Sequence, residues 1–428
     1  MKFIIVIFNL ALIGILPLAA DTWPQWRGPS DNLRATPGAY PIRFDAEHDP
    51  RWTVTLPGKG SSTPVVYNER IIVTCGIGDD DTGLDGVLCY DLNGQELWRT
   101  TLGKQRKGRH RRGSGSCPSP VTDGKLIIVY YKSGTLAALD FSGSVIWRKN
   151  LQKTYGEDKL WWDLGTSPVL VDDKVVVAVM HEENSYVVAL DKRSGAEIWK
   201  TARNFVCAEE SHQSYTTPHV YRDGKSTTLI LFGADHLTGH DATSGEMQWQ
   251  CGGFNPENKK NWRVIASPVI HGDIAVVPYG RENFMAGIKL GGSGDITATA
   301  RLWTQSGIGT DATTPVAQDN KVYFVNYKGT MGCMDVLSGT ECWKIKLPED
   351  KGMFYSSPVL AGDKLYVCRE RGTVYIYQVS GEGANLLHTT NFPDEFFVAT
   401  PVLARNRLLL RGEKRLYCFD AGQESAGQ

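Results

Sequence analysis

The chain contains the segment Ala189-Leu190-Asp191-Lys192-Arg193-Ser194-Gly195-Ala196-Glu197-Ile198-Trp199, which recurs along the sequence. It matches Gly239 to Trp249 and Cys333 to Trp343 position for position. Asp and Ser supply side-chain acceptors for a tight turn, and Gly adopts the positive φ that such a turn needs. The apolar residues on either side therefore predict a β-hairpin whose second strand ends in tryptophan.

A second pattern begins each repeat: a small or hydroxyl-bearing residue, then proline, usually then valine. The eight prolines are Pro64, Pro120, Pro168, Pro218, Pro268, Pro315, Pro358 and Pro401. Apolar runs, a turn and the hairpin segment follow each one. Four strands in a unit of roughly 40–50 residues form one blade of a β-propeller. Proline is tolerated because it opens the first strand, where no ladder hydrogen bond is lost.

The two ends of the chain predict how the ring closes. The eighth repeat, from Pro401, stops at Asp420 before its tryptophan strand, whereas Arg51-Trp52-Thr53-Val54-Thr55 supplies such a strand alone. Pairing them would remove both sheet edges. We therefore expect an all-β fold, a single propeller of eight four-stranded blades closed by the N-terminal strand around Trp52. Seven blades are the alternative, if the weak fifth or seventh copy is not a blade.

The repeated tryptophans are expected to pack between neighbouring blades, because burying a large aromatic ring is strongly stabilising. The structural blade residues are Trp52, Trp98, Trp147, Trp199, Trp249, Trp303 and Trp343. Trp303 ends a degenerate copy, and the seventh copy lacks the tryptophan.

Composition fits a soluble, β-rich protein: 41% of the 428 residues are hydrophobic and 22% are charged. The formal net charge of −1 provides no overall attraction to nucleic acid or to an anionic membrane. We expect a monomer with no nucleic-acid partner and no integral membrane domain after signal cleavage.

Residues 1–20 resemble a secretory signal peptide, with a lysine, an apolar run and small residues before a cleavage site after Ala20. An uncleaved N-terminal anchor is the alternative. The expected organisation is a signal at 1–20, an N-terminal extension at 21–50, the propeller at 51–421 and a tail at 422–428. Export through the Sec route to the periplasm or the extracellular space follows.

Nine cysteines leave at least one thiol unpaired. Cys89, Cys333 and Cys418 each precede an aspartate by two residues, where other repeats hold alanine or glycine. The position therefore favours a small packing residue. Pairing of Cys333 with Cys342 across the hairpin is the alternative. The acidic run from Asp79 to Asp81 lacks the spacing of an EF-hand, so no metal site is predicted.

In an up-and-down blade, the loop between strands two and three lies on the same face as the linker to the next blade. These linkers carry cations, aromatics and acids, which predicts a binding face around the channel for an envelope protein, a peptide or an anionic small ligand. The candidate ligand-binding residues are Arg109, His110, Arg111, Arg112, Trp161, Trp162, Asp163, His212, Trp262 and Arg263. The alternatives are a solvated basic loop, polar rim histidines, and tryptophans that plug the channel mouth. No catalytic residue is assigned.

The S/T-x-P-V opening and the A-x-D-x-x-S-G-x-x-x-W ending resemble the repeats of the PQQ-like β-propeller superfamily. That group includes quinoprotein alcohol dehydrogenases and the outer-membrane protein assembly factor BamB. The resemblance covers about residues 52–420, and Trp23-Pro24-Gln25-Trp26-Arg27-Gly28-Pro29 is similar to the start of many secreted bacterial members.

The resemblance implies one of two functions. The first is a non-enzymatic binding or scaffold protein of the cell envelope, without a cofactor. The second is a PQQ-dependent oxidoreductase of the alcohol or sugar dehydrogenase type, with PQQ and calcium at the channel and an aspartate as base. Such enzymes typically carry two adjacent cysteines beside the quinone, and this sequence has none. The sequence also lacks a C-x-x-C-H haem motif. We therefore favour the binding protein.

Overall fold

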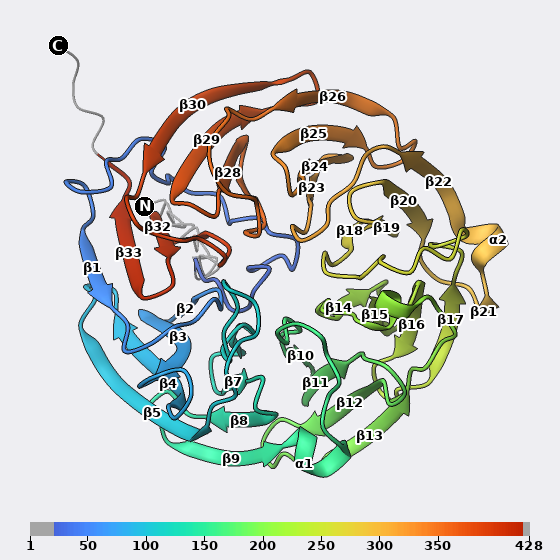
Figure 1. Ribbon diagram of the computed structural model, residues 1–428, viewed down its shortest axis with the longest axis horizontal. Coiled ribbons are helices and arrows are strands. Elements are labelled where there is room, and N and C mark those ends of the chain that lie inside the picture. The colour runs from blue at the N-terminus through green and yellow to red at the C-terminus, as the bar shows by residue number, and fades with distance from the viewer. Residues whose placement is uncertain (1–20, 423–428) are drawn as a thin grey trace, which may run out of the picture.

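The computed structural model describes residues 21–422, which form eight antiparallel sheets around a central axis (Figure 1). The first blade contains β2 (Val65–Tyr67), β3 (Arg70–Ile77), β4 (Leu84–Asp91) and β5 (Glu96–Lys104); the second contains β6 (Val121–Thr122), β7 (Ile127–Tyr130), β8 (Thr135–Leu139) and β9 (Val145–Asn150). The third contains β10 (Val169–Val171), β11 (Lys174–Val179), β12 (Tyr186–Asp191) and β13 (Glu197–Ala202); the fourth contains β14 (His219–Arg222), β15 (Thr227–Gly233), β16 (His236–Asp241) and β17 (Met247–Cys251).

The remaining blades repeat this order from the axis outward. The fifth contains β18 (Val269–His271), β19 (Ile274–Tyr279), β20 (Phe284–Lys289) and β22 (Arg301–Ser306); the sixth contains β23 (Val316–Gln318), β24 (Lys321–Val325), β25 (Thr330–Asp335) and β26 (Glu341–Lys346). The seventh contains β27 (Val359–Ala361), β28 (Lys364–Cys368), β29 (Thr373–Val379) and β30 (Ala384–Asn391); the eighth contains β31 (Val402–Ala404), β32 (Arg407–Arg411), β33 (Arg415–Asp420) and β1 (Trp52–Thr55). The prediction of eight blades is confirmed.

In the described part of the chain, three short helices and one short strand lie outside the four-stranded blades. Helices α1 (Leu151–Tyr155) and α2 (Thr297–Ala300) and the 3-10 helix η1 (Glu209–His212) lie in connections, and β21 (Gly294–Asp295) adds a fifth strand to blade four beside β17. Within residues 21–422, no helix has the length and apolar character needed to cross a membrane. The signal at 1–20 lies outside the described residues, as does all but the first residue of the tail.

The ring closes through its two ends. Strand β1 pairs antiparallel with β33, and Trp52 lies opposite Cys418 (Figure 1). The N-terminal strand thus supplies the outermost strand of the last blade, as predicted. Closure satisfies hydrogen-bonding groups that would otherwise form exposed sheet edges.

The blade tryptophans join each blade to the next. Six indoles donate from Nε1 to a turn carbonyl of the following blade over 2.8–3.4 Å: Trp52 to Leu92, Trp98 to Phe141, Trp147 to Lys192, Trp199 to Ala242, Trp303 to Val336 and Trp343 to Ser380. The turn glycine lies beneath the ring. At Gly195 φ is +69°, and an added Cβ would lie 2.8 Å from the Trp147 ring. Glycine is therefore required by both conformation and space.

The small residue in each repeat lies opposite the tryptophan of its own blade. Cys89 pairs with Trp98 and Cys333 with Trp343 in the strand register. At Gly239, which pairs with Trp249, an added Cβ would lie 2.1 Å from the indole. These cysteines are buried free thiols that leave room for the indole, and Cys342 is also free.

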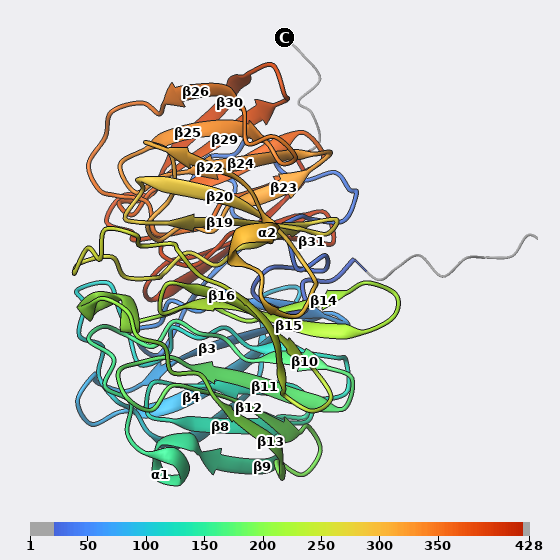
Figure 2. The same cartoon turned by 90° about the vertical axis from the view of Figure 1, so that its right-hand side faces the viewer.

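The N-terminal extension lies across the inner strands. Trp23 exchanges backbone hydrogen bonds with Val66 of blade one, and Arg27 donates to the Thr217 and Pro218 carbonyls of blade four. Asn32 donates to the Ile270 carbonyl of blade five. Seen from the side, the blades form a thick disc with loops on both faces (Figure 2). The extension therefore holds together blades that are distant in sequence.

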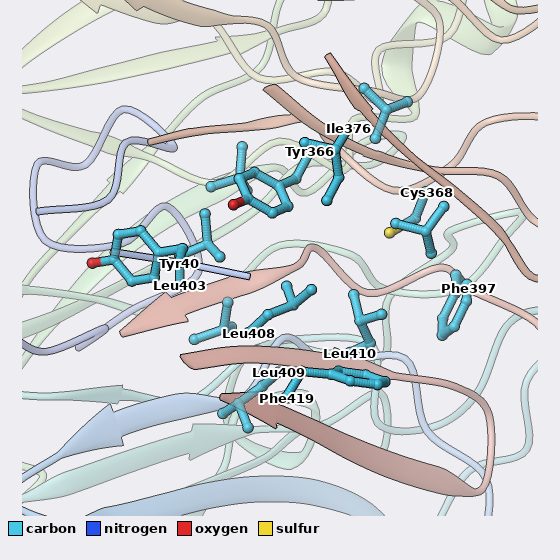
Figure 3. Packing of buried hydrophobic residues seen from close by; sticks show 14 of the residues in the cluster. Tyr40, Tyr366, Cys368, Ile376, Phe397, Leu403, Leu408, Leu409, Leu410 and Phe419 are labelled. Carbon is cyan, nitrogen blue, oxygen red and sulfur yellow. The ribbon is translucent and has the colours of Figure 1, made fainter. Parts of the chain in front are cut away.

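The largest hydrophobic cluster lies between the last blades and this extension. Tyr40 packs beside Tyr366 and Leu403, as Figure 3 shows. The Tyr366 hydroxyl donates to the Pro41 carbonyl over 2.9 Å, and the rings of Phe44 and Phe419 lie 4.5 Å apart. Residues before the first strand are thus part of the core.

Candidate functional site

A cavity of about 350 Å³ lies on the channel axis, and all eight blades line it. It is built from the chain as it enters each innermost strand. Two of the three residues before each repeat proline face the cavity, because side chains alternate along an extended chain. We name the cavity the central cup.

The residue directly before each proline forms the lower layer, which we name the hydroxyl ring. It consists of Thr63, Ser119, Ser167, Thr217, Ser267, Thr314, Ser357 and Thr400. The residue two positions earlier forms the upper layer, which we name the variable ring. It consists of Ser61, Cys117, Gly165, Tyr215, Ile265, Ala312, Tyr355 and Val398.

Hydrogen bonds run around the hydroxyl ring from blade to blade. Seven of the eight hydroxyl oxygens accept the backbone N–H of the equivalent residue in the preceding blade, over 2.9–3.2 Å. The bonds are Thr63 to Ser119, Ser119 to Ser167, Ser167 to Thr217, Thr217 to Ser267, Ser267 to Thr314, Thr314 to Ser357, and Thr400 to Thr63. All eight residues are buried. The ring therefore satisfies amides that have no strand partner at this level.

Trp26 of the N-terminal extension closes the one gap in this ring. The Thr400 hydroxyl accepts no backbone amide among the described residues; it accepts Trp26 Nε1 over 3.2 Å instead. Trp26 also lines the central cup. Since the chain enters the blades from the linker face, the extension lies at the opposite end and forms the floor.

Linker side chains form the mouth of the cup. His110 lies edge-on to Trp162 and to Tyr355, with ring centroids 5.9 and 5.7 Å apart. The hydroxyls of Tyr327 and Tyr355 are 2.8 Å apart, and burial raises the pKa of Tyr355 above its ordinary value. The Tyr215 hydroxyl accepts the Trp162 amide. Aromatic rings from four linkers and one loop therefore surround the opening.

The structure brings five of the ten predicted residues to the cup: His110, Arg112, Trp162, Asp163 and Arg263. The other five lie nearby without lining it. Trp161 is exposed, Arg109 donates to the Leu160 and Trp161 carbonyls, and Arg111 contacts Glu370. His212 ends η1, whereas Trp262 is a buried core residue against Tyr279 and Phe284.

The cup arginines are all paired with carboxylates. Arg112 contacts Glu370 at 3.0 Å and Glu413 at 3.2 Å, and its guanidinium lies 3.2 Å from the centre of the Phe396 ring. Burial raises the pKa of Glu370, but the opposite effect of Arg112 and Arg111 is larger. The pKa of Glu370 therefore lies below its usual value. Arg263 contacts Asp311 at 2.7 Å. The wall is therefore close to electrically neutral.

Asp163 is the only carboxylate that lines the cup in the described part of the chain, and its oxygens are occupied. It pairs with buried Lys132 and accepts the backbone amides of Arg109 and His110 over 2.8 and 3.0 Å. It also lies against Gly113, where any Cβ would overlap its carboxylate. Asp163 thus fixes the loop that carries His110.

His110 is held as a neutral hydrogen-bond donor. Its Nδ1 accepts a hydrogen bond from the Arg112 amide over 3.2 Å. Burial and then the neighbouring Arg111 charge lower the pKa of His110, despite opposition from Asp163. The proton of the neutral ring is consequently on Nε2.

Comparison with known families identifies the repeat. A family model described as outer membrane protein assembly factor BamB matches the chain in overlapping segments, at residues 42–202, 83–250 and 163–386. The chain belongs to the PQQ-like β-propeller family. The overlap is expected of near-equivalent blades, because the model can align in several registers. No curated protein matches the chain.

Solved structures of this PQQ-like propeller type share the fold. BamB from Moraxella catarrhalis aligns with a TM-score of 0.59 at 15% identity, covering 88% of this chain and 98% of that one. A europium-containing methanol dehydrogenase aligns at 0.67 and 11% identity, covering 94% and 98%. Quinohemoprotein alcohol dehydrogenase from Comamonas testosteroni aligns at 0.65 and 12% identity, covering 95% and 82%. At these identities the likeness concerns architecture alone.

The residues of the cup do not fit the metal of a quinoprotein. Calcium takes six to eight oxygen ligands, usually with carboxylates among them. The carboxylate that lines the cup within residues 21–422, Asp163, is already engaged at both oxygens by Lys132 and two amides. Within residues 21–422, no group of three or more His, Cys, Asp or Glu side chains is placed to hold a metal ion.

Sequence reasoning missed the hydroxyl ring, the lysine beneath Asp163 and the carboxylates that pair with the arginines. The ring had a visible signal, since every repeat proline follows Ser or Thr. The ion pairs had none, because Glu370 and Glu413 lie more than 250 residues from Arg112.

Proposed function

We propose that this PQQ-like propeller is an exported, non-enzymatic binding protein whose ligand occupies the central cup on the linker face. The cup combines aromatic and apolar side chains with polar groups that are fixed in place, which is the common form of a small-ligand site. The export step rests on the signal-like residues 1–20. The ligand could be a free molecule or a side chain of an envelope protein or peptide.

The occupied state of Asp163 carries the preference for binding over catalysis. A general base needs a free acceptor within reach of the proton that it removes. Asp163 instead accepts from Lys132 and two backbone amides, and it lies against Gly113. Glu370 is buried and held by Arg111 and Arg112. These carboxylates maintain the shape of the mouth.

Trp162 provides the sharpest test, because its neighbour Trp161 is equally exposed and does not line the cup. The purified protein would be screened by ligand-observed NMR against a panel of neutral and anionic aromatic compounds. We expect Trp162→Ala to weaken the bound compounds at least tenfold and Trp161→Ala to change them less than twofold. Equal effects of the two variants, or no binding by any compound, would contradict the proposal.

Catalysis is tested on the same protein with PQQ and Ca²⁺, using dye reduction with a panel of alcohols and sugars. We expect no quinone-dependent turnover. Turnover that Asp163→Asn abolishes would replace the proposed function with that of a quinoprotein oxidoreductase.

A further inference from the structure

The hydroxyl ring carries O–H donors that are not used by the described part of the chain. Seven of its eight oxygens already accept a backbone amide, and the eighth accepts Trp26 Nε1. Each hydroxyl also carries one proton. Across residues 21–422, none of these hydroxyls donates to another protein group. Eight O–H donors therefore border the cup without a protein acceptor.

Other groups on the cup are also donors. Neutral His110 carries its proton on Nε2, because Nδ1 accepts the Arg112 amide. Arg263 has a buried Nε with no hydrogen-bond partner among the described residues. Of the Tyr327 and Tyr355 hydroxyls, only one can donate to the other. Asp163, the lining carboxylate, has both oxygens in use. The cup thus offers many donors and few free acceptors.

Buried donors without partners are costly, so a site of this kind is completed by an acceptor-rich group. An oxyanion supplies several lone pairs in a small volume, and hydrogen bonds to an ionised acceptor are stronger than neutral ones. Trp162, His110 and Tyr355 stand above the ring and suit a flat apolar body.

We infer that the cup binds an aromatic oxyanion, with its carboxylate or phosphate group on the hydroxyl ring and its aromatic body between Trp162 and Tyr355. This inference rests on the proposed binding function and specifies its ligand class. The hydroxyl donors contact the oxyanion directly, without a metal ion between them. A carboxylate and a phosphate present the same chemistry to the ring and are separated by the test.

Two double variants distinguish the ring from its surroundings. Ser267→Ala/Ser357→Ala removes two hydroxyls that line the cup. Thr216→Val/Ser356→Ala removes the adjacent hydroxyls, which point into the blades and donate to the Phe232 and Ala399 carbonyls. The ring variant loses two bonds that accept backbone amides, whereas the matched variant loses two bonds to carbonyls and a longer contact of Thr216 with Ser214. Only the ring variant loses donors of the cup.

Binding of indole-3-acetate, phenyl phosphate and the neutral analogue indole-3-acetamide would be measured by calorimetry on the full chain, well below the melting temperature of each variant. We expect at least one oxyanion to bind ten or more times tighter than the acetamide. The ring variant should weaken that oxyanion at least tenfold and change the acetamide less than threefold, whereas the matched variant should change neither by more than twofold. Whichever oxyanion binds tighter identifies the preferred head group.

Acetamide binding as tight as that of the oxyanions would overturn the inference and leave the proposed cup function standing. An oxyanion whose affinity is the same in the ring variant and the wild type would also overturn it. Failure of all three probes would overturn it as well; the proposed function falls only if the wider panel also fails to bind.

Discussion

The two layers of the central cup begin on the same eight strands, two residues apart, yet they differ in composition. The hydroxyl ring holds Ser or Thr in every blade, whereas in the variable ring only tyrosine occurs twice. The difference follows from hydrogen bonding. In seven blades the ring hydroxyl accepts the backbone amide of the preceding blade, so these positions share one task; in the eighth, Thr400 accepts Trp26 Nε1 instead. A variable-ring side chain has no such task and can define the shape of the cup.

Removing hydroxyls from the ring gives the largest expected loss of stability. In Ser267→Ala/Ser357→Ala, the amides of Thr217 and Thr314 lose their acceptors. Each unsatisfied buried amide costs about 1–3 kcal/mol, so we expect the free energy of unfolding to fall by roughly 2–6 kcal/mol. Urea denaturation followed by circular dichroism measures this change.

Tyr355→Phe is the control from the variable ring. It removes a hydroxyl that bonds to Tyr327 and lies beside the exposed Arg111 but accepts no backbone amide, so we expect a loss below about 1.5 kcal/mol. If the two variants destabilise the protein equally, the division of tasks between the rings is wrong.

Acidification tests the support beneath the hydroxyl ring, where the buried His219 lies 3.1 Å from Asp31. Burial lowers the pKa of His219 to about 4; Asp31 opposes this shift and Arg27 adds to it. The unfolded state therefore binds a proton more readily, and stability present above about pH 6.5 is lost as the pH falls towards 4. The share of His219 is about 1.4 kcal/mol per pH unit across that window.

His219→Gln should flatten the fall in the free energy of unfolding between pH 6.5 and 4, as measured by urea titrations at each pH. His240, whose pKa burial also lowers to about 4, keeps part of the slope in the variant. An unchanged slope would mean that His219 takes up no proton on unfolding.

Two arginines of the basic linker, Arg112 and Arg111, differ in how far they are buried in the wall of the cup. Arg112 is 15% exposed and joins Glu370 and Glu413 from two other blades, whereas the Arg111 side chain is 57% exposed. Removing Arg112 takes a cationic partner from a buried carboxylate, so we expect Arg112→Ala to lower the free energy of unfolding by about 2–3 kcal/mol. Arg111→Ala should lower it by less than about 1 kcal/mol. Melting curves of both variants decide whether the linker is a solvated loop or a structural wall.

Gly165 of the variable ring gives the smallest expected change. An added Cβ would meet Tyr215 at 3.4 Å, an ordinary contact distance. We therefore expect Gly165→Ala to shift the free energy of unfolding by less than about 0.5 kcal/mol while narrowing the cup. The affinity of any ligand found for the cup should change more than the stability does; the reverse would place Gly165 in the framework.

The extent of successful prediction follows from the range of the interactions. The blades and the closing strand could be predicted because the hairpin turn, the small residue and the tryptophan recur within one repeat. Half of the candidate residues were found at the cup because linkers and channel share one face. Trp262 could not be separated from the others, since only the fold shows that it packs against Tyr279 and Phe284.

The sequence by itself determined the number of blades, the place of each tryptophan and the hydroxyl before each proline, because local patterns repeated eight times carry that information. Only the tertiary structure decided that those hydroxyls meet in one ring, that Trp26 completes it, and that the arginines of the mouth are neutralised by acids from other blades. The physical reason is that these contacts join residues from 43 to 374 positions apart, and no spacing along the chain records which linkers converge on the axis.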